Sequence, residues 1–182
     1  MIGGTITVQK LRSFNVALAA LHTAQGVAVL LLSKRFALPV TGSYLKFNAA
    51  TQHLQPAVTT LLHIQLPWLI ALFFFLSALA HIFVATIYNR RYNQNLGRGI
   101  NKVRWIEYSL SASVMMVAIG LLVGIYDLSS LVMLFALVSI MNLMGLVMEV
   151  HNQTTKKTSW LSYYIGCWAG VVPWLPRPAR AA

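Results

Sequence analysis

Four long stretches of the chain are apolar and nearly free of charged side chains. The first covers residues 14–33, contains no charge and has basic residues on either side. The next three cover residues 65–88, 105–126 and 131–148, and a shorter fifth run covers residues 160–175. A helix needs about 20 mostly apolar residues to cross the hydrocarbon core of a bilayer. The pattern therefore predicts about five membrane spans over these ranges.

Short polar connectors separate the five runs, and no internal repeat is evident. Because lipid offers the backbone no hydrogen-bond partners, each span must satisfy its own polar groups as a helix. Pro67 lies near the start of the second run, where a missing N–H costs a helix least. We expect an all-α integral membrane bundle over residues 1–175, with an up-and-down topology and no soluble domain.

The composition agrees with a membrane protein and excludes other classes. Hydrophobic residues make up 58% of the 182 residues and charged residues 9%, against roughly 25% charged in soluble domains. The net charge of +11 indicates contact with anionic lipid headgroups rather than with nucleic acid. A single cysteine, Cys167, excludes an intrachain disulfide and a zinc site built from cysteines.

Basic residues near the span ends predict the orientation of the chain. Nine of them fall on the side that holds the N-terminus and the second and fourth connectors: Lys10, Arg12, Arg90, Arg91, Arg98, Lys102, Arg104, Lys156 and Lys157. Five fall on the opposite side: Lys34, Arg35, Lys46, Arg177 and Arg180. We therefore expect a multi-pass protein of the cell membrane with its N-terminus in the cytoplasm.

Glu107 is the only acidic residue in the interior of a predicted span. Ser111 lies four residues later on the same helix face, and Tyr108 lies alongside. Buried ionisable groups are costly in a membrane and often functional. Two interpretations remain open: Glu107 is a counterion or proton acceptor, or it pairs at the interface with Arg104, three residues earlier.

Two histidines lie within spans, His22 near Gln25 in the first and His81 near Ser77 in the second. Each is either a hydrogen-bonded packing residue or part of a proton relay with Glu107. No span contains a histidine or glutamate pair at metal-ligand spacing, so no metal site is expected. No convergent nucleophile and base is evident either, so we do not expect an enzyme.

Three motifs resemble the heliorhodopsins, which are microbial retinal-binding proteins. They are RWIEYSLSAS at residues 104–113, FALPVTGSYL at 36–45 and GCWAGVVPW at 166–174. Together with His22 and His81, the resemblance covers essentially residues 14–174. It implies a rhodopsin-like bundle of seven helices, a homodimer, a cytoplasmic N-terminus and a light-driven sensory role without efficient ion pumping. An unidentified signalling partner would go with that role.

The resemblance also implies roles for particular residues. Glu107 would be the counterion of a protonated retinal Schiff base, since an opposite charge favours the cationic form. His22 and His81 would match a buried pair linked to the proton released from that base. Further residues near the chromophore would be Tyr108, Ser111, Met115, Met141, Gly145, Gly170 and Pro173.

The family attaches retinal to a lysine in its seventh helix, and none of the six lysines here falls within a predicted span: Lys10, Lys34, Lys46, Lys102, Lys156 and Lys157. Residues 176–182 also depart from the apolar pattern of the family. We expect the chain to be a fragment with about five of seven helices that lacks the attachment lysine.

Three hypotheses follow for the function. The first is a retinal photoreceptor of the heliorhodopsin type. The second is a retinal-free membrane interaction protein or a non-functional remnant. The third is a small proton- or cation-conducting protein that uses Glu107, His22 and His81, and it requires a continuous polar path.

Overall fold

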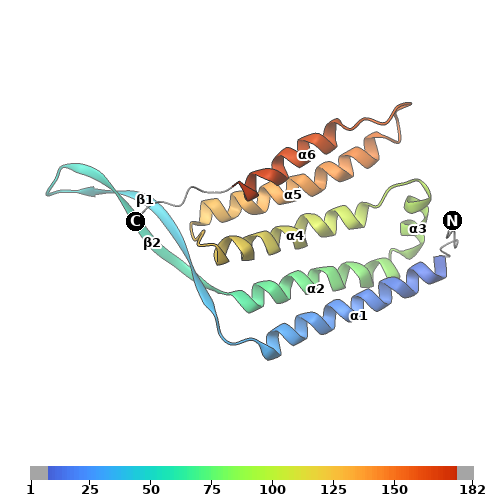
Figure 1. The fold of residues 1–182 in the computed structure, drawn as a ribbon, viewed down its shortest axis with the longest axis horizontal. Coiled ribbons are helices and arrows are strands. Elements are labelled where there is room, and N and C mark those ends of the chain that lie inside the picture. The colour runs from blue at the N-terminus through green and yellow to red at the C-terminus, as the bar shows by residue number, and fades with distance from the viewer. Residues whose placement is uncertain (1–7, 176–182) are drawn as a thin grey trace.

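The computed structural model describes residues 8–175. Four of its helices are long and apolar enough to cross a membrane: α1 (Val8–Leu32), α2 (Leu66–Ala85), α4 (Lys102–Leu122) and α5 (Leu128–His151). They run side by side in a bundle, as Figure 1 shows. The prediction of a helical membrane bundle is therefore confirmed.

The helix bounds differ from the predicted span bounds by up to six residues. α1 begins at Val8 rather than at residue 14, and α5 continues to His151 rather than ending at residue 148. Hydropathy marks only the part of a helix that lies in hydrocarbon, whereas the helix itself can continue into the headgroup layer. Lys10 and Lys102 consequently lie within the first turns of α1 and α4 instead of in connectors.

The fifth apolar run forms a shorter helix than the other spans. α6 (Leu161–Val171) has 11 residues and leads into the 3-10 turn η1 (Val172–Trp174). At 1.5 Å per residue, α6 is about half as long as the hydrocarbon core is thick. The chain beyond Leu175, where a departure from the family pattern is predicted, lies outside the described residues.

Two elements are absent from the prediction: a β-hairpin and a short helix. β1 (Ala37–Asn48) and β2 (His53–Gln65) pair antiparallel from Ala37 with Gln65 to Asn48 with His53. The hairpin projects beyond the helix ends in Figure 1. α3 (Asn89–Gly97) lies at the opposite end of the bundle, between α2 and α4. Residues 37–48 and 53–65 therefore form a two-stranded sheet rather than a polar connector.

A small apolar core anchors the hairpin to the bundle. It consists of Val40 of β1, Leu121 of α4 and Leu131 of α5, which are 1%, 0% and 4% exposed. Next to it, the backbone N–H of Thr41 donates to the carbonyl of Tyr126 over 2.8 Å. The hairpin is thus held by packing and by a main-chain bond to the α4–α5 connection.

Asp127 caps the N-terminus of α5 close to this apolar core. The Ser129 hydroxyl donates to its carboxylate, and the backbone N–H of Ser130 donates over 3.1 Å. These two hydrogen bonds lower the pKa of the Asp127 carboxyl below its ordinary value. The side chain therefore satisfies a free N–H of the first turn as a charged cap.

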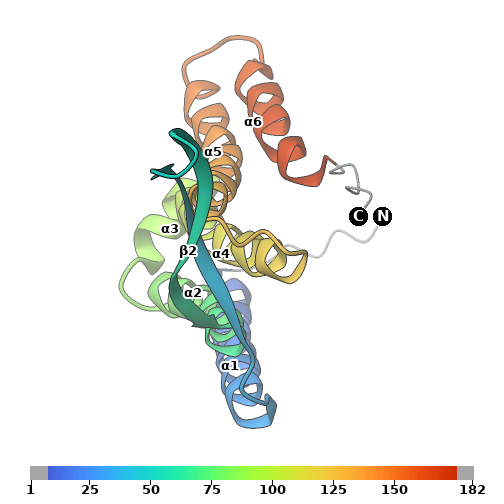
Figure 2. The same cartoon turned by 90° about the vertical axis from the view of Figure 1, so that its left-hand side faces the viewer.

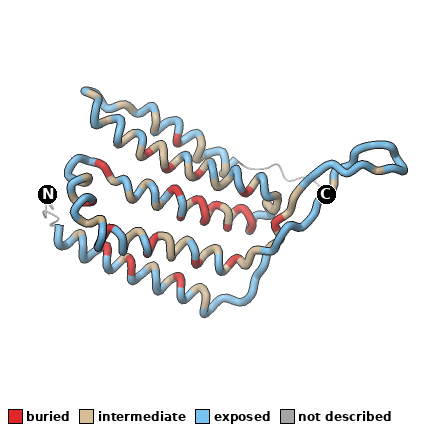
Figure 3. Tube along the Cα trace, turned by 180° about the vertical axis from the view of Figure 1, so that it is seen from behind, coloured by how far each residue is buried: buried red, intermediate tan, exposed pale blue. Residues whose placement is uncertain are grey.

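Neighbours in sequence are neighbours in the bundle. α1 packs on α2, α2 on α4, α4 on α5 and α5 on α6, and the end view in Figure 2 shows these helices as a curved row. Buried residues gather along α4 in Figure 3. α4, which carries Glu107, is therefore the central helix of the described part of the chain.

Candidate functional site

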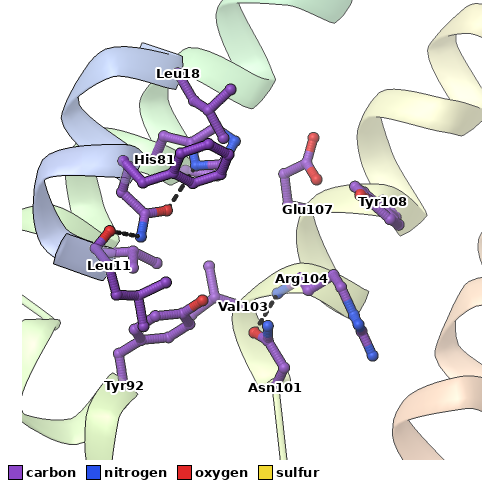
Figure 4. Close-up of a pocket in the computed structure, with 13 residues that line it drawn as sticks. Leu11, Leu18, His81, Tyr92, Asn101, Val103, Arg104, Glu107 and Tyr108 are labelled. Atoms are coloured by element: carbon purple, nitrogen blue, oxygen red, sulfur yellow. Dashed lines mark hydrogen bonds between the residues drawn. The ribbon is translucent and has the colours of Figure 1, made fainter. Parts of the chain in front are cut away.

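A cavity of about 200 Å³ with both apolar and polar lining residues lies between α1, α2, α3 and α4, toward the end of the bundle that carries α3. Figure 4 shows Glu107 on α4 and His81 on α2 at opposite walls of this cavity. Its polar lining residues come from all four helices and the α3–α4 connection: Asn15, His81, Tyr92, Asn101, Arg104, Glu107 and Tyr108. The fold therefore brings together three residues predicted for the site, Glu107, Tyr108 and His81.

The carboxylate of Glu107 is partly buried and accepts a hydrogen bond from α2. The Ser77 hydroxyl donates to its Oε1 over 2.6 Å. Ser77 is itself buried, with 7% of its surface exposed. A hydroxyl bonded to one carboxylate oxygen fixes the orientation of the side chain. Within residues 8–175, no hydrogen bond to the second oxygen of Glu107 is present.

Arg104 does not pair with Glu107 but with Glu149 on α5. A guanidinium nitrogen of Arg104 lies 2.8 Å from Oε1 of Glu149. The other oxygen of Glu149 accepts the backbone N–H of Asn101 over 2.7 Å. Glu149 thus holds the basic side chain that lies nearest to Glu107 in the sequence. The interpretation that Glu107 pairs with Arg104 does not match this geometry.

Glu107 has no ion-pair partner among residues 8–175. All six lysines of the chain lie in that range, and none of them lines the cavity. A carboxylate taken out of water is stabilised by a nearby cation or by a proton. The surroundings of Glu107 therefore fit a cation such as a protonated retinal Schiff base. The amine of that Schiff base would have to come from a group other than these six lysines.

His22 and His81 are neighbours between α1 and α2. Their rings stack with centroids 5.6 Å apart and planes inclined by 16°. Nδ1 of His22 lies 2.9 Å from Oε1 of Gln25, and Nδ1 of His81 lies 2.8 Å from Oδ1 of Asn15. The predicted histidine pair is thus in contact, although only His81 lines the cavity that contains Glu107.

Asn15 is a residue that the sequence analysis did not find. It is 5% exposed and hydrogen-bonded to His81. A signal was present, because Asn15 lies seven residues before His22 and therefore on the same face of α1. An amide on the histidine face of an apolar span indicates a polar partner on the neighbouring helix.

The remaining residues predicted near the chromophore divide into two groups. Ser111, which is 2% exposed, and Met115 follow Glu107 and Tyr108 along α4. Met141 and Gly145 lie on α5, Gly170 on α6 and Pro173 in η1, and none of these four lines the Glu107 cavity. Met141 packs directly against Gly170. Met141 and Gly170 therefore belong to the α5–α6 contact.

Gly145 allows α5 to approach the indole ring of Trp105 on α4. A Cβ atom at this position would overlap that ring. The Arg104 guanidinium lies 4.6 Å from the centroid of the same ring, over its face. Its Nε1 is buried without a hydrogen-bond partner in the described part of the chain. Gly145 is thus a packing position between the two helices.

Gly145→Ala is expected to lower the free energy of unfolding by about 1–3 kcal/mol, because the added methyl group overpacks the α4–α5 contact. The matched control is Gly97→Ala, where nothing lies within 4 Å of the added atom. Unfolding in mixed detergent micelles, followed by tryptophan fluorescence, measures both. Equal stability of the two variants would contradict the packing role of Gly145.

A comparison with models of known protein families identifies the family of the chain. The heliorhodopsin family model matches residues 11–177, which include the cavity residues and all helices from α2 to α6. A search of curated proteins gave no match. The matched range takes in nearly the whole chain. The chain belongs to the heliorhodopsin family, whose members are light-sensing membrane proteins that bind retinal.

Proposed function

We propose that this chain functions as a retinal photoreceptor with a sensory role, in which Glu107 is the counterion of a protonated Schiff base. The observation that carries the proposal is the partly buried carboxylate of Glu107, which accepts a hydrogen bond from the Ser77 hydroxyl and has no ion-pair partner among residues 8–175. When bound as a Schiff base, retinal would supply a polyene that isomerises in light, and the imine nitrogen, which comes from the condensing amine, would carry a proton.

The side chains around Glu107 keep its charge available for such a cation. Ser77 donates to Oε1 and orients the carboxylate, while Glu149 on α5 pairs with Arg104. A negative charge within about 4–6 Å of an imine raises the pKa of that imine. Tyr108, Ser111 and Met115 would then line the path of the chromophore along α4, and His22 and His81 would accept the proton that it releases.

A sensory role accords better with α4 than ion conduction does. The hydroxyls of Ser109 and Ser113 donate to carbonyls of their own helix, those of Ile106 and Ser109, each over 2.7 Å. From Val114 to Leu122 α4 has only apolar residues and Gly120. These features disfavour the continuous polar path that the conducting hypothesis requires, and a sensory role implies a signalling partner.

The proposal is tested by supplying the imine from outside. All-trans-retinal condensed with n-butylamine gives a Schiff base that needs no lysine. Added to the chain in lipid nanodiscs, this imine is expected to give a visible band at longer wavelength than in nanodiscs without protein. An unshifted spectrum would favour the second hypothesis, a retinal-free membrane interaction protein or a non-functional remnant.

We also propose a homodimer, which the exposed apolar side chains of the hairpin support. Tyr44, Leu45, Phe47, Leu54 and Val58 are each at least half exposed, and such surfaces favour association. Mass photometry of the nanodisc preparation distinguishes a monomer from a dimer. Particles with two chains are expected. Particles with a single chain at all concentrations would contradict a dimer.

A cytoplasmic N-terminus in the cell membrane is the orientation we propose, supported by the nine basic residues at the end of the bundle that carries α3. The test uses single cysteines in a Cys167→Ser background, at Gln52 in the hairpin turn or at Thr155 in the α5–α6 connection. A membrane-impermeant maleimide on intact cells is expected to label Gln52→Cys and to reach Thr155→Cys only after permeabilisation. The reverse pattern would contradict the orientation.

A further inference from the structure

Asn15 is a buried amide whose two ends have different partners. Its Nδ2 donates to the carbonyl of Leu11 in the preceding turn of α1, over 2.9 Å. Its Oδ1 lies 2.8 Å from Nδ1 of His81 on α2. The residue is 5% exposed, so water has little access to compete for either contact.

The two contacts determine where the proton of His81 lies. A backbone carbonyl only accepts hydrogen bonds, so the Asn15 atom that faces Leu11 is the nitrogen. The atom that faces His81 is then the amide oxygen, which also only accepts. Nδ1 of His81 must therefore be the donor and carry a hydrogen.

We propose that Asn15 is a positioning residue that holds neutral His81 as the Nδ1–H tautomer and leaves Nε2 as its proton-accepting atom. A neutral imidazole carries one N–H, so protonation at Nδ1 leaves a lone pair on Nε2. Nε2 has no hydrogen-bond partner among the described residues. This inference rests on the proposed function, because it names the atom at which His81 would receive a proton from the Glu107 side of the cavity.

The same conclusion does not extend to His22. Its Nδ1 faces Oε1 of Gln25 over 2.9 Å, but within residues 8–175 the Gln25 amide makes no second bond that would fix which end faces the ring. The His22 ring also stacks on that of His81, and this contact does not select either nitrogen of His22 as the donor. Asn15 therefore makes His81 the histidine with a defined acceptor atom.

The test is ¹⁵N NMR of histidine-labelled chain in lipid bilayers at alkaline pH, where the shifts of Nδ1 and Nε2 report which nitrogen carries the hydrogen. The signals of His81 are those lost in His81→Gln. In the wild-type chain His81 is expected as Nδ1–H. Asn15→Asp keeps an acceptor oxygen and is expected to preserve that tautomer.

Asn15→Leu removes the acceptor and is expected to lower the ratio of Nδ1–H to Nε2–H by about tenfold, the factor supplied by a hydrogen bond worth about 1.4 kcal/mol. The matched control is Asn142→Leu. Asn142 is a buried asparagine, 6% exposed, whose Nδ2 donates to the Val138 carbonyl in the preceding turn of α5. This variant is expected to leave the His81 tautomer unchanged.

Two outcomes would overturn the inference: Nε2–H on His81 in the wild-type chain, or an unchanged tautomer in Asn15→Leu. The wild-type spectrum decides the first without any variant having to fold. Because the readout needs no retinal, a chain that fails to bind the imine but shows Nδ1–H on His81 would contradict the photoreceptor proposal and leave the role of Asn15 intact.

Discussion

Leu121→Ala is expected to lower the free energy of unfolding by about 2–5 kcal/mol and to loosen the hairpin from the bundle. Leu121 has no exposed surface and lies in the last turns of α4. Its side chain is the centre of the core that joins Val40 of β1 to Leu131 of α5. Truncation to alanine would leave a cavity where the hairpin meets the bundle and remove apolar contacts to both β1 and α5.

Leu122→Ala is the matched control, because Leu122 is the next residue of the same helix and is 56% exposed. Unfolding in mixed micelles measures the stability of both variants. The rate of hydrogen exchange at the Thr41 amide measures how often the contact between the hairpin and the bundle opens. We expect a large loss of stability and faster exchange in Leu121→Ala alone. Similar losses in both variants would show that this core does not hold the hairpin.

The membrane helices are predictable from sequence because the thickness of the bilayer sets their length. Residues 65–88 and 105–126 predict α2 and α4 to within a few residues for that reason. The hairpin is different: its pairing joins residues such as Ala37 and Gln65, which are far apart in the chain. The strands have 12 and 13 residues, fewer than the about 20 apolar residues by which a membrane span is recognised. Pro39 and Pro56 also weaken the pattern by which a strand is recognised.

The site is predictable in its chemistry but not in its pairings. Glu107 and the two histidines stand out because ionisable groups are rare within spans. Sequence spacing places Arg104 within reach of Glu107, yet Arg104 binds Glu149 on another helix. Glu149 also accepts a backbone N–H from Asn101 and is thereby fixed in place. Such contacts depend on how helices pack, which spacing along one helix does not reveal.

Glu107→Gln is expected to lower the pKa of the bound retinylidene imine by about 1–3 units relative to the wild-type chain. Glutamine has nearly the same shape and retains a carbonyl oxygen that can accept from Ser77. The substitution therefore removes the charge and leaves the packing between α2 and α4 nearly unchanged. One pKa unit corresponds to about 1.4 kcal/mol of interaction between the imine proton and the counterion.

A suitable control removes the same charge elsewhere. Asp127→Asn does so at the hairpin end of the bundle, where the side chain caps α5, and asparagine is itself a good N-cap. We expect this variant to leave the pKa of the imine unchanged. Glu149→Gln is unsuitable, because it would release Arg104 from its ion pair beside the site.

The most direct measurement is a spectrophotometric pH titration of the n-butylamine imine of all-trans-retinal in nanodiscs that contain the wild-type, Glu107→Gln or Asp127→Asn chain. If Glu107 is the counterion, the visible band of the protonated imine persists to higher pH in the wild-type and Asp127→Asn chains than in Glu107→Gln. The same titration midpoint in all three chains would contradict the role of Glu107 as the counterion.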